Sequence, residues 1–535
     1  MGLMTRPDVT KFEDGSKFFE HEYDDFYLKA YVPSTKIDGQ VNNYGFRAPL
    51  LLVFEEERKT MDEAIAFAKE SGLSDIASSM DSSVIFIYPT CEGGWEKADE
   101  KVYVSLIAEV KNDPFYEDGI CKITDFFKQE FKGYFVRGAI FRADIYSYGK
   151  SADYVATKLL KKIDGEYLWG PGEITPAMCS MENLSVVPNV ERKDIAILSV
   201  GNSDEINKAF DGCEHLLIKD KADYKADFKA FVRRFKMWCG KIEYEPDFEA
   251  LDMTEKSEYT LVKTSPDNKG RFKDLPEHKV GYFTYYNNGL FDNGPVPLLI
   301  GLHGGGDSSL YLTFVAEWWE ICHRYGFLYV SIENHMDVTA TEIVEVIEDL
   351  KKKYDIDEKR IYASGFSMGS GKTWDLYQEY PNVFAGLAPC SALFPIKNNP
   401  WGMSLGDPRL NTTVPVPVFY SGGEESFLPE LPFKDETSLD RFKYAAATNK
   451  LKAASEIEGL VFEDKDNWKD HFYGVPGEKV EKFFDETRGS TLTVNYYESE
   501  DGVVRTAFGS VSGQNHECRH HSIETAWKFI SKFTR

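Results

Sequence analysis

The sequence lacks the features that mark a membrane protein or an exported protein. No segment approaches the roughly 18 consecutive apolar residues that suggest a membrane-spanning helix. The amino terminus has no apolar core of signal-peptide length. The eight cysteines lie apart, without a C-x-x-C pair, which is typical of buried thiols in a reducing compartment. We therefore expect no membrane partner and a cytoplasmic location.

Basic stripes and metal-binding motifs are also missing. The 88 acidic residues outnumber the 62 Lys and Arg residues, and the formal net charge is −26. Because a surface of this sign repels nucleic acid, we expect no nucleic-acid partner. The chain contains no H-E-x-x-H motif and no Cys/His cluster with ligand spacing, so nothing in it calls for a metal or an organic cofactor.

What the sequence does contain is a loop with two possible interpretations, "GFSMGSGKT" at residues 365–373. Its end resembles a phosphate-binding P-loop, but that motif needs a glycine five positions before Gly371, where Phe366 stands. Its beginning is a G-x-S-x-G nucleophile elbow centred on Ser367. The β-rich "KRIYASG" before the loop and the helical pattern after it are the context that an elbow requires. In this interpretation Lys372 lies within the helix, where a solvated lysine is expected.

The rest of the chain supplies the partners that an elbow needs. Upstream, a buried-strand pattern ends in "HGGG" at residues 303–306, whose backbone amides can stabilise an oxyanion. We assign the two donors to Gly305 and to Met368, the residue after the serine. Downstream follow a strand with acids in its loop and then a histidine-rich loop before a final amphipathic helix. The order Ser, acid, His is that of the α/β-hydrolases.

The stretch "YDIDEKRIYASGFSMGSGKTWDLYQEYPNVFAGLAPCSA", with the upstream "LHGGGDSS", resembles the polyhydroxybutyrate-depolymerase-like and feruloyl-esterase-like branch of the α/β-hydrolases. The resemblance covers roughly the second half of the chain. It implies that the triad acid is Glu425, with Glu424 as an alternative, because the loop reads Ser-Gly-Gly-Glu-Glu. It also favours His516, which follows a glycine-containing loop, over His520 and His521.

These residues predict a serine carboxylic-ester hydrolase. His516 would take the proton of Ser367 as the serine attacks an ester carbonyl, and Glu425 would orient the imidazole. The resemblance implies small or carbohydrate-linked acyl esters of feruloyl, acetyl or hydroxyacyl type as substrates. The alternatives are a serine peptidase of the prolyl-oligopeptidase type and a non-catalytic binding protein on a hydrolase scaffold. The oligomeric state is left open.

A chain of 535 residues is too long for one ordinary core, and its first half reads as a weaker copy of the second. The pattern "APLLLVFEEERKT" matches "VPLLIGLHGGGDS", and a second match aligns Ser147 with Ser367. Three glutamates and an arginine replace the histidine and glycines of the oxyanion loop. Ser147, Asp204 and His215 could form a residual triad, but a structural or substrate-shaping role is favoured.

The predicted fold class is therefore α/β: two α/β-hydrolase-like domains in tandem, each a doubly wound, mostly parallel sheet. We place a catalytically degenerate domain at residues 1–245 and the catalytic domain at 246–535. The second domain carries a cap-like insertion at about residues 430–495. Its aromatic residues either wall a pocket or anchor the insertion; they are Trp468, Phe472 and Tyr473.

Overall fold

The structure is a computed structural model that divides into two compact units, unit 1 at Met1–Pro246 and unit 2 at Asp247–Arg535. It describes residues 9–35, 41, 47–111, 138–167, 170–231, 234–236, 242–270, 272–305, 308–309, 311–333, 335–392, 411–428 and 430–535. The division falls one residue from the expected boundary.

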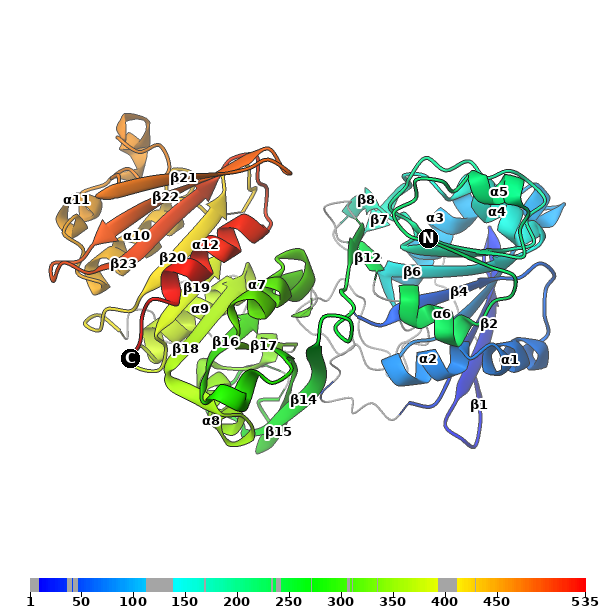
Figure 1. Cartoon of the computed structure of the whole chain (residues 1–535), viewed down its shortest axis with the longest axis horizontal. Helices are drawn as coiled ribbons and strands as arrows, with labels where there is room; N and C mark the ends of the chain where they lie inside the picture. Colours follow the sequence, from blue (N-terminus) through cyan, green and yellow to red (C-terminus); the bar gives the residue numbers. More distant parts are fainter. Residues whose placement is uncertain are drawn as a thin grey trace. The chain divides into compact units, whose positions relative to one another are not determined.

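Unit 1 is built around a nine-stranded sheet in the order β1-β2-β3-β5-β4-β6-β9-β10-β11 (Figure 1). Its strands are β1 Val9–Lys11, β2 Lys17–Glu22, β3 Phe26–Val32, β4 Pro49–Phe54, β5 Val84–Pro89, β6 Ala139–Tyr148, β9 Met178–Glu182, β10 Ala196–Val200 and β11 Leu216–Lys219. Two small hairpins are β7 Asp164–Tyr167 with β8 Gly170–Glu173, and β12 Arg234–Lys236 with β13 Ile242–Tyr244. The helices are α1 Met61–Glu70, α2 Leu73–Met80, η1 Gly94–Glu96, α3 Lys101–Lys111, α4 Lys150–Lys158, α5 Asp204–Lys208 and α6 Tyr224–Phe231.

Unit 2 is built around a ten-stranded sheet in the order β14-β15-β17-β16-β18-β19-β20-β23-β22-β21. Its strands are β14 Met253–Lys263, β15 Glu277–Asn287, β16 Val296–Leu302, β17 Leu328–Ile332, β18 Ile356–Phe366, β19 Gly386–Cys390, β20 Val418–Gly423, β21 Lys479–Asp485, β22 Ser490–Glu498 and β23 Val504–Val511. Its α-helices are α7 Trp318–Tyr325, α8 Ala340–Lys353, α9 Met368–Glu379, α10 Glu436–Thr448, α11 Ala454–Glu458 and α12 His520–Ile530. Short helical turns are η3 Leu290–Asn293, η4 Tyr311–Val315, η5 His335–Asp337 and η6 Phe462–Asn467.

The two sheets share one topology over eight strands. The order β2-β3-β5-β4-β6-β9-β10-β11 corresponds to β14-β15-β17-β16-β18-β19-β20-β23, with the same parallel and antiparallel pairings at every step. Even an irregularity recurs, since the register shifts at Pro49/Leu50 in unit 1 and at Val296/Leu298 in unit 2. This confirms the α/β class and the tandem arrangement.

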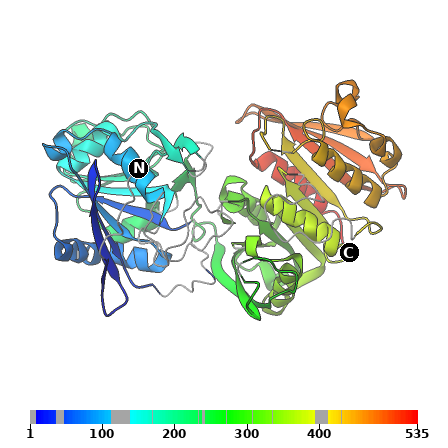
Figure 2. The ribbon, with the colours of Figure 1, turned by 180° about the vertical axis from the view of Figure 1, so that it is seen from behind.

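Helices cover both faces of each sheet, which explains why the central strands are continuous apolar runs. In unit 2, α7 and α12 lie on one face (Figure 1). Figure 2 shows the opposite face, where α8, α9 and α10 pack against the strands around a large apolar core. In unit 1, α1, α2 and α6 share one core, and α3 and α4 lie on the other face.

The segment expected to be a cap is instead built into the sheet. Strands β22 and β21 add to β23 as an antiparallel extension. Helix α10 packs into the main core through Leu439, Phe442 and Ala445. Tyr473 is fully buried and its hydroxyl donates to the carbonyl of Gly509, 2.7 Å away. Trp468 and Phe472 are partly buried against the same core, so the insertion's aromatic residues anchor it.

Backbones meet very closely where β18 passes into α9. A methyl group at Gly369 would lie 1.9 Å from the carbonyl oxygen of Leu302, and one at Gly365 would lie 2.1 Å from the carbonyl oxygen of Gly369. Since real side chains do not approach backbone atoms so closely, only glycine fits both positions. The glycines of G-x-S-x-G thus let strand, turn and helix pack in contact.

We predict that Gly369→Ala destabilises unit 2 by at least about 2 kcal/mol, because the added methyl group must displace backbone rather than a flexible side chain. Gly459→Ala is the matched control. Gly459 ends α11 with φ −71°, and a methyl group there would meet its nearest atom at 3.4 Å, so we expect little change or a small gain. Scanning calorimetry of both variants measures the difference. Equal melting curves would contradict the packing argument.

Candidate active site

Ser367 occupies the sharp turn between β18 and α9. Its backbone has φ 54° and ψ −112°, a conformation that residues with a side chain rarely adopt. Its amide donates to the carbonyl of Cys390 at the end of β19, 3.0 Å away, which helps to hold the turn in place. The side chain is 6% exposed. The hydroxyl therefore stands on a fixed backbone at the end of a central strand.

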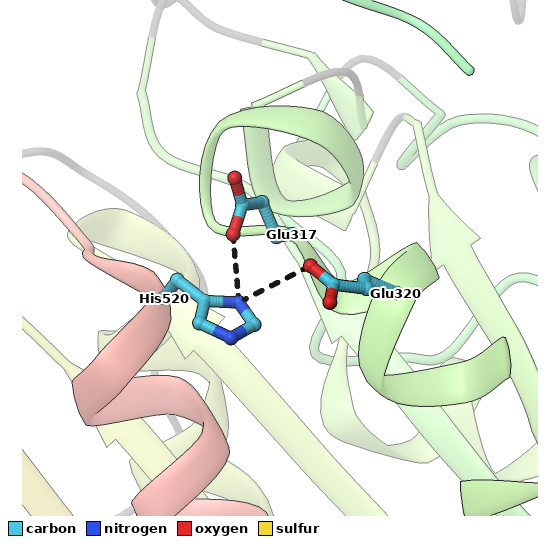
Figure 3. Close-up of side chains that lie close together, drawn as sticks. All are labelled: Glu317, Glu320 and His520. Carbon is cyan, nitrogen blue, oxygen red and sulfur yellow. Dashed lines mark ion pairs between the residues drawn. The ribbon is translucent and has the colours of Figure 1, made fainter. Parts of the chain in front are cut away.

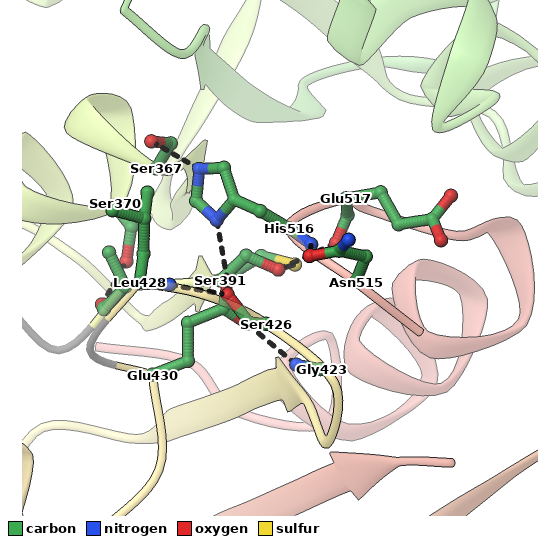
Figure 4. Close-up of polar contacts among 12 residues, drawn as sticks. Ser367, Ser370, Ser391, Gly423, Ser426, Leu428, Glu430, Asn515, His516 and Glu517 are labelled. Atoms are coloured by element: carbon green, nitrogen blue, oxygen red, sulfur yellow. Dashed lines mark hydrogen bonds and ion pairs between the residues drawn. The ribbon is translucent and has the colours of Figure 1, made fainter. Parts of the chain in front are cut away.

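His516 faces this serine. Ser367 Oγ lies 2.8 Å from His516 Nε2 (Figure 4). The imidazole comes from the loop between β23 and α12, which is fixed by hydrogen bonds from Gln514 Nε2 and from Ser391 Oγ to the carbonyl of Glu517 at 2.8 and 2.6 Å. The other two candidate histidines lie elsewhere, since His520 Nδ1 is 2.8 Å from Glu317 and His521 Nδ1 is 3.6 Å from Asp485.

The carboxylate beside His516 is Glu430, not Glu425. Glu430 Oε1 lies 2.5 Å from His516 Nδ1. The same carboxylate accepts hydrogen bonds from the backbone amide of Gly423 at 2.6 Å and from Ser426 Oγ at 2.5 Å (Figure 4). Glu430 is 1% exposed. Three donors thus surround a buried carboxylate and fix the position of its oxygens.

The expected acids lie too early in the loop. Glu425 is exposed, and its backbone amide donates to the carbonyl of Gln514 at 2.9 Å. Glu424 is half-buried and accepts from Ser510 Oγ at 2.8 Å. The chain turns back after these residues, and this turn places Glu430 beside His516. A signal was present in the sequence: Glu430 stands within the apolar "FLPELPF", and an acid that is buried with such a stretch requires a partner.

The glycine loop after β16 runs against the elbow. A methyl group at Gly304 would lie 2.8 Å from the Phe366 ring and 3.4 Å from Ser367 Cβ. His303 fixes this loop, because its ring nitrogens lie 2.7 Å from the carbonyl of Gly304 and 2.6 Å from that of Glu333. Burial lowers the pKa of His303. Gly305 follows in the turn, and Met368 begins α9. Their amides remain predicted oxyanion donors.

Helix α9 is buried on all sides, and this overturns the expectation of a solvated lysine. Lys372 is 0% exposed and lies 3.5 Å from Asp375 Oδ2, which is also buried. Burial raises the pKa of Asp375 to about 8, against the opposing effect of the Lys372 charge. The elbow pattern identified where the helix begins, but it carries no information about how many neighbours cover it.

Unit 1 has the same turn without the serine. Gly149 precedes α4 with φ 57° and ψ −128°, close to the values of Ser367. The strand registers agree, since Phe54 pairs with Ser147 as Leu302 pairs with Gly365. The sequence alignment of Ser147 with Ser367 was therefore wrong by two residues. A shift of two keeps the in-and-out alternation of a strand, so side-chain pattern could not detect it.

Glu56 fills the space where a nucleophile would stand in unit 1. A methyl group at Gly149 would lie 2.2 Å from Glu56 Oε1, and the amide of Lys150 donates to the same oxygen at 3.4 Å. The other residues proposed for a residual triad do not meet. Ser147 is buried and donates to the carbonyl of Ser180 at 2.7 Å, whereas Asp204 and His215 are exposed.

Within the described residues, one cluster could hold a cation by distance alone: Glu317, Glu320 and His520, between α7 and α12 (Figure 3). Arg324 already compensates one of these acids, since its guanidinium contacts Glu320, and it also contacts the neighbouring Glu524. Burial opposes charging of His520, but the hydrogen bond to Glu317 and the charges of Glu317, Glu320 and Glu524 outweigh it and raise its pKa. We interpret the cluster as an ion-pair network.

Comparisons with known proteins relate the chain to esterases. The chain is 25% identical over 247 residues to a bifunctional acetylxylan esterase/xylanase of Neocallimastix patriciarum, covering 44% of this chain and 31% of that protein. It is 26% identical over 164 residues to poly(3-hydroxyalkanoate) depolymerase C of Paucimonas lemoignei, covering 26% and 36%. The matches thus span about a third of each curated relative. They relate the chain to the esterase-like α/β-hydrolases.

No family model matches the chain. Among solved structures, S-formylglutathione hydrolase from Staphylococcus aureus matches at 13% identity and a TM-score of 0.32, over 52% of this chain and 99% of that one. The feruloyl esterase module of Clostridium thermocellum matches at 15% identity and a TM-score of 0.31, over 54% and 92%. Among the described residues, no helix has the length and apolar character that crossing a membrane requires.

Glu430→Gln is predicted to lower kcat for ester hydrolysis by about 10³- to 10⁴-fold, because the amide no longer stabilises the imidazolium or holds its tautomer. Glu425→Gln is the matched control, and we expect its kcat to stay within about twofold of wild type, as for a surface change away from the site. Steady-state kinetics of both variants on one activated ester measure this. A severe loss in Glu425→Gln with an active Glu430→Gln would reverse the assignment.

The His520 network predicts a pH-dependent stability with a defined sign. Because the folded-state pKa of His520 is raised, its contribution is complete below the unfolded pKa of about 6.5 and is lost as the pH rises through the folded value. His520→Gln should therefore lose most stability near pH 5.5 and least near pH 8.5. Thermal melting at several pH values measures it.

His521 supplies a control of opposite sign. Burial lowers its pKa to about 4, so this histidine destabilises the folded state as the pH falls below about 6.5. His521→Gln should relieve that acid destabilisation. Parallel pH profiles for the two variants would contradict both assignments.

Proposed function

We propose that unit 2 is a serine carboxylic-ester hydrolase that acts on small or carbohydrate-linked acyl esters. The observation that carries the proposal is the chain of contacts from Ser367 through His516 to Glu430, at 2.8 and 2.5 Å. A neutral imidazole placed in this way can accept the serine proton while its other nitrogen donates to a buried carboxylate.

The reaction follows from these positions. Ser367 Oγ attacks the ester carbonyl carbon and passes its proton to His516. The amides of Gly305 and Met368 then stabilise the oxyanion, a donor of this kind contributing roughly 3 kcal/mol. His516 protonates the departing alcohol, which leaves an acyl group on Ser367. A water molecule, deprotonated by His516, releases the acid and restores the serine.

An exposed aromatic ring near His516 favours a substrate whose acyl or alcohol group has an apolar face. Phe427 is 72% exposed, and its ring centroid lies 5.9 Å from that of His516 in an edge-on arrangement. The curated relatives are named for acetylxylan and for a poly(3-hydroxyalkanoate), which favours acetyl or hydroxyacyl esters. The peptidase alternative has less support, because unit 1 is an α/β sheet and not a propeller.

We predict that a fluorophosphonate probe labels the full chain once, at Ser367, and that Ser367→Ala abolishes both labelling and ester hydrolysis to below about a thousandth of wild type. Ser147→Ala is the matched control, because Ser147 only bonds the carbonyl of Ser180. Intact mass measures labelling. A panel of p-nitrophenyl acyl esters, methyl ferulate, acetylated xylan and Xaa-Pro amides measures substrate class.

The outcomes separate the three functional classes. An unlabelled wild type would favour a binding protein on a hydrolase scaffold. Cleavage of amides in preference to every ester would favour a peptidase. Labelling that survives Ser367→Ala and disappears in Ser147→Ala would move the chemistry to unit 1.

A further inference from the structure

Unit 1 contains a pocket of about 760 Å³ at the carboxyl ends of its central strands. It is lined by Tyr148 at the end of β6, by Glu182 and Asn183 at the end of β9, and by Lys221 in the loop after β11. The corresponding ends of β18, β19 and β23 lead to the elbow, to Ser391 and to the His516 loop in unit 2. The pocket therefore lies at the edge of the sheet where α/β folds bind ligands.

The turn that follows Tyr148, which corresponds to the elbow of unit 2, lacks the groups for acyl transfer. Gly149 replaces the nucleophile, and Glu56 accepts from the Lys150 amide where an oxyanion would be bound. In unit 2 the residue at the Glu56 position is Gly304, as the strand pairing shows. A carboxylate there repels a developing negative charge. The remaining chemistry of the pocket is that of binding.

One wall of the pocket is aromatic. The rings of Phe67 and Tyr148 lie 6.0 Å apart with their planes 31° from parallel. Lys59 Nζ lies 5.5 Å from each ring centroid. An apolar surface and a charged donor are thus adjacent, an arrangement that suits a ligand with both C–H faces and hydroxyl groups.

The lining of the pocket includes acidic and basic side chains in nearly equal number. Glu182 accepts from the Tyr224 hydroxyl, and burial raises its pKa. Two other acids, Glu70 and Asp223, also line the pocket, as do the lysines Lys59 and Lys221. Three carboxyl groups disfavour a phosphate, and two ammonium groups disfavour a bare divalent cation. A neutral ligand hydroxyl suits both kinds of side chain, because it can donate to a carboxylate and accept from an ammonium group.

The geometry points to a binding site in unit 1 for a short neutral saccharide. The volume lies within the range of about 300–1,000 Å³ that small-molecule sites occupy. The site is separate from the chemistry at Ser367 and does not depend on unit 2 being an esterase. It gives the first unit a role in ligand binding that requires no nucleophile.

Calorimetric titration of the full chain carrying Ser367→Ala tests this inference without turnover. The probes are xylotriose, cellotriose, mannotriose and maltotriose, with inorganic phosphate and magnesium chloride as the competing chemistries. We expect at least one trisaccharide to bind at millimolar concentration or tighter. Adding Glu182→Gln should raise its Kd by about tenfold or more, since a hydrogen bond to a charged acceptor is weakened.

Glu205→Gln is the matched control. Glu205 is an exposed acid of the same unit, in α5, and does not line the pocket. Its Kd should equal that of the parent. If Glu182→Gln is unfolded by calorimetric melting, Lys59→Met replaces it in the same comparison.

Three results would overturn the proposal. The first is no heat of binding with any of the four trisaccharides. The second is saccharide binding that neither Glu182→Gln nor Lys59→Met weakens, which would place it elsewhere. The third is binding of phosphate or magnesium that depends on these residues while the saccharides fail to bind. Failure of ester hydrolysis in the wild-type chain would leave this result unaffected, so the two proposals can fail separately.

Discussion

Close backbone contact at the start of α9 holds Ser367 in a conformation that a residue with a side chain avoids. Gly365 and Gly369 permit this contact, and Leu302 supplies the carbonyl against which Gly369 packs. The arrangement fixes more than the hydroxyl. It brings β16 and its glycine loop against the elbow, and it directs the first amides of α9 toward the same place. The position of the Ser367 hydroxyl is thus fixed before His516 and Glu430 are placed beside it.

Unit 1 shows what this turn does without its nucleophile. Gly149 adopts nearly the same dihedral angles, so the fold itself retains the turn. What differs is the loop opposite, where Glu56 stands in place of a glycine and its carboxylate lies against the turn. A buried ion pair between Lys29 and Glu55, 2.9 Å apart, joins that altered loop to β3. The turn can thus form without a nucleophile. In unit 2 the same turn carries Ser367, with His516 beside it.

The sequence alone was sufficient for the α/β class, the tandem arrangement and the neighbours Ser367 and His516, because glycine spacing and chain order are local signals. Prediction from the sequence failed for features that depend on the course of the chain in three dimensions. Glu430 lies five residues beyond the expected acid, and only the course of the loop around Gly423 and Ser426 selects it. The burial of Lys372 depends on neighbours from distant segments. The strands of the insertion were missed because nothing in a local pattern says which edge they join.

The sheet extension β21–β22 has a consequence for the behaviour of the protein at high concentration. Within the described residues β21 ends the sheet order, so one side of its backbone has no strand beside it. Val480 and Phe484 on this strand are 46% and 65% exposed. An open edge with exposed apolar residues invites pairing with another chain, but charged residues of the same strand flank them. They are Lys479, Glu481, Lys482 and Asp485. Charge on this one strand therefore protects a sheet of ten strands from intermolecular growth.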